Sequence, residues 1–315
     1  MALTGNDLIS DSYARCEKIT SAQARNFSYG IRLLPPAERR AMSAIYAMAR
    51  RIDDIGDGDL STDAKLKSLA AARASLDAIQ SGGRAGGRSG GEAPGEARGE
   101  ARGEAQEELV GLDDPVMLAL GDAARQFPIP MAAFGDLIEG CEMDASGSVY
   151  ETFDELVVYC RCVAGSIGRL SLGVFGSTDQ GVATAKADSL GVALQVTNIL
   201  RDLVEDRDVL GRVYLPREDL ARFGVSPDLD GSPDDLSALV IFEARRALPW
   251  WEEGLSLLPL LDWRSRACVA AMAGIYRRLF TAIQRQPTAV LTSRLSLPTW
   301  EKAWVATCAL AGVGM

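Results

Sequence analysis

The sequence predicts an all-α protein that folds as a single domain. Apolar residues recur at helical spacing through most of the 315 residues, whereas the alternation typical of strands is scarce. Hydrophobic residues make up 47% of the chain, which is enough for one sizeable core. The helical pattern continues on both sides of the one obvious break in the sequence, so we expect one core built from residues 1–315.

That break lies at about residues 81–106, where glycine, arginine and repeated GEAR tetrapeptides replace the apolar pattern. A segment of this composition cannot bury enough apolar surface to join a core. We therefore expect a flexible insertion between two helices of the same domain.

Composition excludes several classes of site and partner. The chain contains no histidine, which removes the usual general base, histidine-activated nucleophiles and histidine-ligated zinc. A net charge of -10 argues against a nucleic-acid partner. Six cysteines without a CxxC pair are typical of buried thiols in a reducing cytoplasm. The N-terminus lacks a signal-peptide pattern and no segment reads as a transmembrane helix, so we expect a cytoplasmic location.

The segment 191–216 carries the most specific chemical pattern. Gln195, Asn198, Asp202 and Asp206 recur at helical spacing, which places their oxygens along one stripe. A neighbouring apolar stripe indicates that this helix packs against others, so its carboxylates are expected to face an enclosed space. Unpaired buried carboxylates are costly, and oxygen ligands of this kind suit Mg²⁺.

A second polar stripe lies on an apolar, alanine-rich helix predicted around residues 41–57. Tyr46, Arg50, Asp53 and Asp57 recur at intervals of four, three and four. One aspartate pair on one helix is typical of a solvated face, but two pairs on apolar helices favour a metal site. Together the helices would hold several Mg²⁺ ions around a diphosphate and neutralise the charge that develops as it leaves.

Two other groups of residues are less specific. Acidic residues after position 135 have few such partners and precede the loop-like ASGS, so we expect them to be solvated; they are Asp136, Glu139, Glu142 and Asp144. Small residues in the helical segment 163–173 either leave a channel for a hydrocarbon chain or allow close helix packing; they are Ala164, Gly165, Gly168 and Gly173.

Aromatic residues and a loop complete the predicted site. Aromatic faces stabilise carbocations, and the candidates to line the site are Phe27, Tyr46, Tyr159 and Tyr276. The loop after the second acidic helix contains Arg212 and Tyr214, which its position in the sequence allows to close over a bound diphosphate.

Three long segments resemble a known family. YAMARRIDDIGD, YCRCVAGSIGRL and ALQVTNILRDLVEDRDVLGRVYLP are similar to the signature segments of the squalene and phytoene synthases, and the similarity covers nearly the whole chain apart from the insertion. The resemblance implies an isoprenoid synthase-type helical bundle with a central cavity flanked by two aspartate-rich helices. It also implies a head-to-head condensation of two prenyl diphosphates that depends on Mg²⁺, with Mn²⁺ as an alternative metal.

The resemblance also implies roles for individual residues. The implied metal ligands are Asp53, Asp57, Asn198, Asp202 and Asp206. The implied substrate contacts are Arg50, Gln195, Arg201 and Arg212, and Tyr159 would assist proton removal as a cyclopropane ring forms. Many relatives carry a serine-rich run before Phe27, whereas this chain reads QARNF, so Gln23, Arg25 and Asn26 are expected to take over those contacts.

Within the family, NFSYGIRLLP and RLSLPTWEKAWVA are most similar to bacterial presqualene diphosphate synthases of hopanoid pathways, the HpnD type. This similarity predicts farnesyl diphosphate as substrate, a cyclopropyl diphosphate as product and no requirement for NADPH. So apolar a product suggests peripheral contact with the inner face of the membrane and transfer to a downstream hopanoid or squalene enzyme. The alternatives are a phytoene synthase that uses geranylgeranyl diphosphate, a full squalene synthase, and a non-catalytic assembly factor. The intact aspartate pairs weigh against the last.

Overall fold

The computed structural model describes residues 5–24, 26–85, 114–292 and 294–312. These residues form helices and no strand, which confirms the all-α prediction. The first half contains α1 (Gly5–Gln23), α2 (Phe27–Ile31), α3 (Pro36–Asp57), α4 (Thr62–Ala85), α6 (Pro115–Gln126) and α7 (Ala133–Ala145). The second half contains α8 (Phe153–Cys160), α9 (Ser166–Phe175), α10 (Gln180–Glu205), α11 (Arg217–Arg222), α12 (Pro233–Leu255), α13 (Trp263–Arg285) and α14 (Thr299–Leu310). The short turns are the π-helical η1 (Arg161–Gly165) and η2 (Asp206–Leu210) and the 3-10 helices η3 (Leu258–Leu260) and η4 (Pro287–Leu291).

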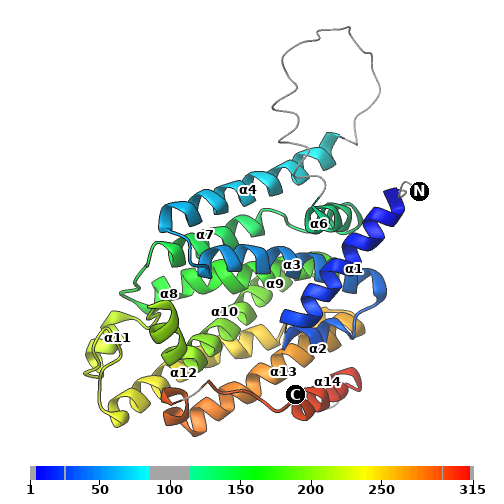
Figure 1. The fold of residues 1–315 in the computed structure, drawn as a ribbon. Coiled ribbons are helices and arrows are strands. Elements are labelled where there is room, and N and C mark those ends of the chain that lie inside the picture. Colours follow the sequence, from blue (N-terminus) through cyan, green and yellow to red (C-terminus); the bar gives the residue numbers. More distant parts are fainter. Residues whose placement is uncertain (1–4, 25, 86–113, 293, 313–315) are drawn as a thin grey trace.

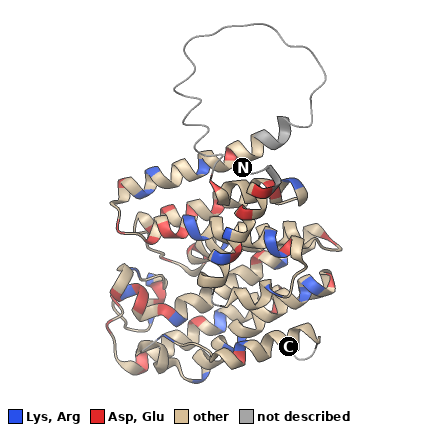
Figure 2. Cartoon of the chain, turned by 45° about the vertical axis from the view of Figure 1, so that its right-hand side comes forward, with Lys and Arg blue, Asp and Glu red and all other residues tan. Residues whose placement is uncertain are grey.

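Helices α3, α9 and α10 form the centre of the bundle, between α4 and α7 on one side and α12 and α13 on the other (Figure 1). Helix α3 begins at Pro36, whose fixed φ suits the first position of a helix. Helix α10 begins after Asp179, whose side chain accepts a hydrogen bond from the backbone N–H of Val182. Their apolar faces are buried in the core, and basic and acidic residues are interspersed along the helices (Figure 2).

Helices α8 and α9 are joined by η1 into one helical rod. A capping box between Thr152 and Glu155 begins the rod, and Gly176, with a φ of 65°, ends it. Contrary to the sequence-based expectation, this stretch is long and apolar enough to cross a membrane by length and composition. In this protein 56% of its most apolar window is buried against other helices, as in the core helix of a helical bundle.

Close packing explains the small residues of the rod. A Cβ atom added to Gly168 would lie 2.7 Å from the backbone oxygen of Ala187 in α10, and one added to Gly173 would lie 2.7 Å from the side chain of Pro130. Ala164 and Gly168 also line the central cavity.

The helix before the insertion is longer than expected. Helix α4 continues to Ala85, so the first residues of the expected insertion are helical; residues 86–113 lie outside the described part of the chain. The apolar C-terminal segment forms α14, which buries Val305 and Ala306 but leaves Trp300 and Trp304 exposed. The six cysteines are unpaired and five of them are buried, as predicted.

Candidate active site

A cavity of about 410 Å³ runs between the central helices. One end is lined by aspartates and arginines near the C-terminal ends of α3 and α10, and the remainder is largely apolar. Met42 and Ala187 line the apolar part; each lies about 22 Å along its helix from Asp57 and Asp202 respectively, at the rise of an α-helix. The cavity therefore suits a molecule with a charged head and a long apolar tail.

On the α3 side of the polar end, Asp57 forms an ion pair, whereas Asp53 forms none among the described residues. Asp57 accepts a hydrogen bond of 2.7 Å from Nη1 of Arg212, which follows the second acidic helix. Asp53 is partly buried, and the Sγ of Cys141 lies 3.9 Å from its Oδ1. Burial and the nearby Asp57 raise the pKa of Asp53 to about 7. A proton or a cation is therefore favoured beside Asp53 at neutral pH.

The α10 side repeats this arrangement. Asp202 accepts hydrogen bonds from Nε and Nη2 of Arg201, at 2.8 and 2.5 Å, and Nε of Arg294 lies 3.0 Å from its Oδ1. Asp206, at the start of η2, forms no ion pair with an arginine among the described residues. Burial, Asp202 and Glu205 raise the pKa of Asp206 to about 7. Of the two predicted aspartates on each side, one is thus bound by an arginine and the other favours a proton or a cation.

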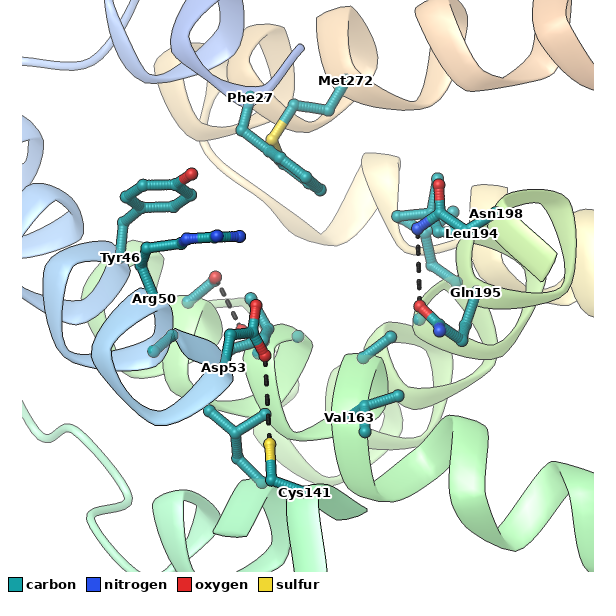
Figure 3. Close-up of a pocket in the computed structure, with 18 of the residues that line it drawn as sticks. Phe27, Tyr46, Arg50, Asp53, Cys141, Val163, Leu194, Gln195, Asn198 and Met272 are labelled. Carbon is teal, nitrogen blue, oxygen red and sulfur yellow. Dashed lines mark hydrogen bonds between the residues drawn. The ribbon is translucent and has the colours of Figure 1, made fainter. Parts of the chain in front are cut away.

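Two amide side chains of α10 face the α3 side across the cavity. Figure 3 shows Gln195 and Asn198 opposite Arg50 and Asp53. Nδ2 of Asn198 donates a hydrogen bond of 3.4 Å to Oε1 of Gln195, whereas Oδ1 of Asn198 is buried without a partner. A buried acceptor without a partner is costly unless a ligand uses it.

These donors fit Mg²⁺, which prefers oxygen ligands and usually keeps water and phosphate oxygens in its remaining positions. The buried oxygen of Asn198 and the two carboxyl groups of raised pKa are suitable donors. Within the described part of the chain, no three acidic or cysteine side chains gather closely enough to hold a metal ion by themselves.

A tyrosine wall, formed by Tyr150, Tyr159 and Tyr214, lies beside the acidic residues. The rings of Tyr159 and Tyr214 stack with centroids 5.2 Å apart, and Tyr150 packs 5.4 Å from Tyr159. The hydroxyls of Tyr159 and Tyr214 both donate to Asp144, at 3.0 and 2.9 Å. Burial raises the pKa of Asp144 to about 6.

The prediction that the acidic residues after position 135 are solvated is wrong for Asp144. Its side chain is 12% exposed and lines the cavity. The other members of the run behave more nearly as expected: Glu139 is exposed, and Asp136 and Glu142 pair with Arg169 and Arg73.

The structure brings most of the other predicted residues to the cavity. Its lining includes Phe27, Tyr46, Arg50, Arg201 and Arg212. Tyr276 is buried next to this lining, with its ring centroid 5.8 Å from that of Phe27. Asn26 is the N-cap residue of α2 and has a buried oxygen without a partner, whereas Arg25 lies outside the described residues.

Sequence reasoning missed Arg294. This residue precedes α14 in a segment without a helical pattern, yet it reaches Asp202, 92 positions earlier in the chain, and Glu205. A solitary arginine in a loop gives no signal of such a contact. Only the three-dimensional structure reveals it.

Comparisons with known proteins agree with this geometry. The family model for squalene/phytoene synthase matches residues 20–301. A protein named phytoene synthase from Mycobacterium tuberculosis is 46% identical over 310 residues, which cover 96% of this chain and 92% of the relative. A phytoene synthase from Arthrospira platensis is 34% identical over 312 residues, which cover 93% and 90%.

Solved structures show the same fold. A dehydrosqualene synthase in complex with a ligand has a TM-score of 0.78 and 27% identity, and the match covers 96% of this chain and 97% of that one. The squalene synthase HpnC from Alicyclobacillus acidocaldarius has a TM-score of 0.71 and 28% identity, with 88% and 95% covered. These matches confirm the expected isoprenoid synthase-type bundle. The chain therefore belongs to the squalene/phytoene synthase family of prenyltransferases.

Proposed function

We propose that this protein is a phytoene synthase, which condenses two geranylgeranyl diphosphates head to head. The relatives at 46% and 34% identity carry that name, and their similarity extends over more than nine-tenths of this chain. They favour the longer substrate over the farnesyl diphosphate predicted from two short HpnD-like segments. The observation that carries the reaction type is the pair of acidic helices at the charged end of a long apolar cavity.

The first step is the departure of diphosphate from one substrate molecule. Mg²⁺ held by Asp53, Asp57, Asn198, Asp202 and Asp206 would supply charge that neutralises the leaving diphosphate. Arg201 and Arg212 would donate charge-assisted hydrogen bonds to phosphate oxygens, exchanging an aspartate partner for the substrate. The apolar lining excludes water from the allylic cation, and the rings of Phe27 and Tyr46 stabilise its charge.

The second step joins the two chains. The 2,3 double bond of the second molecule attacks the cation, and loss of one proton closes a cyclopropane ring. Tyr159 would take that proton at its phenolic oxygen while its own proton passes to Asp144, to which it already donates at 3.0 Å; the released diphosphate is the alternative acceptor. A second ionisation and loss of another proton then give phytoene, so this route needs no NADPH.

The test is to incubate the purified protein with Mg²⁺ and either geranylgeranyl or farnesyl diphosphate, each with and without NADPH, and to identify products by mass spectrometry. We expect a forty-carbon hydrocarbon from geranylgeranyl diphosphate that does not depend on NADPH. No product from either substrate would overturn the proposal and favour a non-catalytic binding role.

A second candidate is condensation of two farnesyl diphosphates. It is supported by the similarity to a dehydrosqualene synthase, with a TM-score of 0.78. In the same assay a thirty-carbon diphosphate or hydrocarbon without NADPH would support it, and squalene formed only with NADPH would indicate a full squalene synthase.

A further inference from the structure

A charged cluster outside the cavity lining joins α8, α11 and α12. Nη1 of Arg246 in α12 donates to Asp219 of α11 at 2.5 Å. The guanidinium of Arg246 also lies 4.0 Å from the ring centroid of Phe153, the first residue of α8. Glu243, one turn before Arg246, completes the cluster with its Oε1 3.8 Å from the same Nη1. The side chains of Asp219 and Glu243 are only 5% and 1% exposed.

This cluster contains two buried carboxyl groups and one cation. Arg246 forms its short bond with Asp219, while both carboxyl oxygens of Glu243 are buried without a donor. The charged groups that face Glu243 are Asp219 and Glu218 of α11 and Arg246 of its own helix. A second buried negative charge here would be costly, whereas a proton on Glu243 leaves the cluster neutral and bonds to Asp219. Accordingly, burial and then Asp219 raise the pKa of Glu243 to about 8.

The helices held by the cluster carry residues of the candidate active site. Tyr159 lies on α8, and the loop with Arg212 and Tyr214 leads directly into α11. The backbone N–H groups of Arg217 and Glu218 donate to the carbonyls before α8, at 2.9 and 3.2 Å. The beginnings of α8 and α11 are therefore fastened to each other and, through Arg246, to α12.

We infer that Asp219, Glu243 and Arg246 form a positioning cluster that shares one proton between its two carboxyl groups and holds Tyr159, Arg212 and Tyr214 in place. When the proton leaves, Asp219 and Glu243 repel each other and compete for Arg246, so α11 loses its attachment to α12. The affinity for a diphosphate substrate then falls. The activity readout of this inference rests on the proposed function, whereas its stability readout does not.

Glu243→Gln is the decisive variant because glutamine keeps the donor and the shape of the protonated acid and cannot ionise. Between the ordinary glutamate pKa of about 4.3 and about 8, the folded wild type holds a proton that the unfolded chain has lost, so stability falls as pH rises and levels off above that window. The variant lacks this loss, and we expect it to melt about 5 °C above the wild type at pH 8.5. The wild-type kcat/KM should fall about tenfold per pH unit above pH 8, whereas the variant's fall should be smaller.

Glu252→Gln is the matched control, because Glu252 is exposed on the same helix and should leave both pH profiles unchanged. Asp219→Asn is a second test, because it leaves only one carboxyl group to pair with Arg246. It should also remove the loss of stability and of kcat/KM at high pH. If Glu243→Gln and Asp219→Asn both keep the wild-type profiles, the inference is overturned. A changed melting profile with an unchanged activity profile would overturn the positioning role. If no variant forms product, the proposed function fails, and the melting profiles still decide whether the proton is shared.

Discussion

The two acidic helices share a pattern and differ in what holds them. On α10, Asp202 is bound by Arg201 of the same helix and by Arg294 from the C-terminal loop. On α3, Asp57 is bound by Arg212, which lies 155 positions later in the chain. The α10 pair is therefore preorganised largely by its own helix, whereas the α3 pair depends on the segment that joins α10 to α11. Under the proposed function, metal binding on the α3 side would therefore depend on the position of that segment.

The largest expected effect comes from Asp53 and Asp206, which form no ion pair with an arginine within the described part of the chain. Asp53→Asn and Asp206→Asn should each lower kcat by about 10³-fold, since both would contact the ions that stabilise the leaving diphosphate. Steady-state product formation measures this loss, with circular dichroism to verify the fold. Asp59→Asn, at an exposed position just beyond α3, is the control. A variant that retained a tenth of wild-type kcat would remove its aspartate from the mechanism.

Two variants of the tyrosine wall test whether Tyr159 accepts a proton or only holds Asp144 in place. Tyr159→Phe should lower kcat by about 10²-fold with little change in KM, because the variant lacks only the phenolic oxygen that would take the proton in the proposed reaction. Tyr214→Phe removes a similar hydrogen bond to Asp144 and should have a much smaller effect. Equal losses in the two variants would show that the hydroxyls act only by holding Asp144.

Replacing Arg212, which binds Asp57, and Arg294, which binds Asp202, measures how strongly each acidic helix depends on a distant segment of the chain. Arg212→Gln breaks the bond between the α3 side and the loop and should raise KM about tenfold, the cost of one charge-assisted hydrogen bond. Arg294→Gln removes a contact whose arginine is 45% exposed, so a change of about twofold is expected. Initial rates over a range of substrate concentrations give both values. A larger change in KM for Arg294→Gln than for Arg212→Gln would contradict the stronger dependence expected for the α3 side.

The smallest expected effect is on the stability of the metal-free protein. The pKa values of Asp53 and Asp206 are raised to about 7, so the folded state holds protons that the unfolded chain has lost above about pH 4. Stability should therefore fall as pH rises from about 4 to about 7. Adding Mg²⁺ at pH 7.5 should raise the melting temperature by a few degrees, because it would neutralise carboxylates that have lost their protons by that pH. A melting temperature that did not change when Mg²⁺ was added would contradict the proposed metal ligands.

Much of the site was predictable because helical periodicity places Asp53, Asp57, Asp202 and Asp206 without knowledge of the fold. Asp144 and Arg294 were not predictable, since their partners lie 15 to 92 positions away in the sequence. Local composition could not show that the helix before the insertion continues to Ala85. The predicted substrate length rested on two short segments, and similarity over more than nine-tenths of the chain outweighs them.

The π-helical turn η1 sets the register of the cavity wall. Five residues at every fourth position of the rod line the cavity: Tyr159, Val163, Ile167, Ser171 and Phe175. In a regular α-helix each such step drifts by about 40°, so Phe175 would point about 160° away from Tyr159. The wider turn at Arg161–Gly165 absorbs an extra residue and removes most of that drift. Deleting one residue there would rotate Tyr159 by about 100° relative to Phe175, so the length of this turn fixes which side chains of the rod face the cavity.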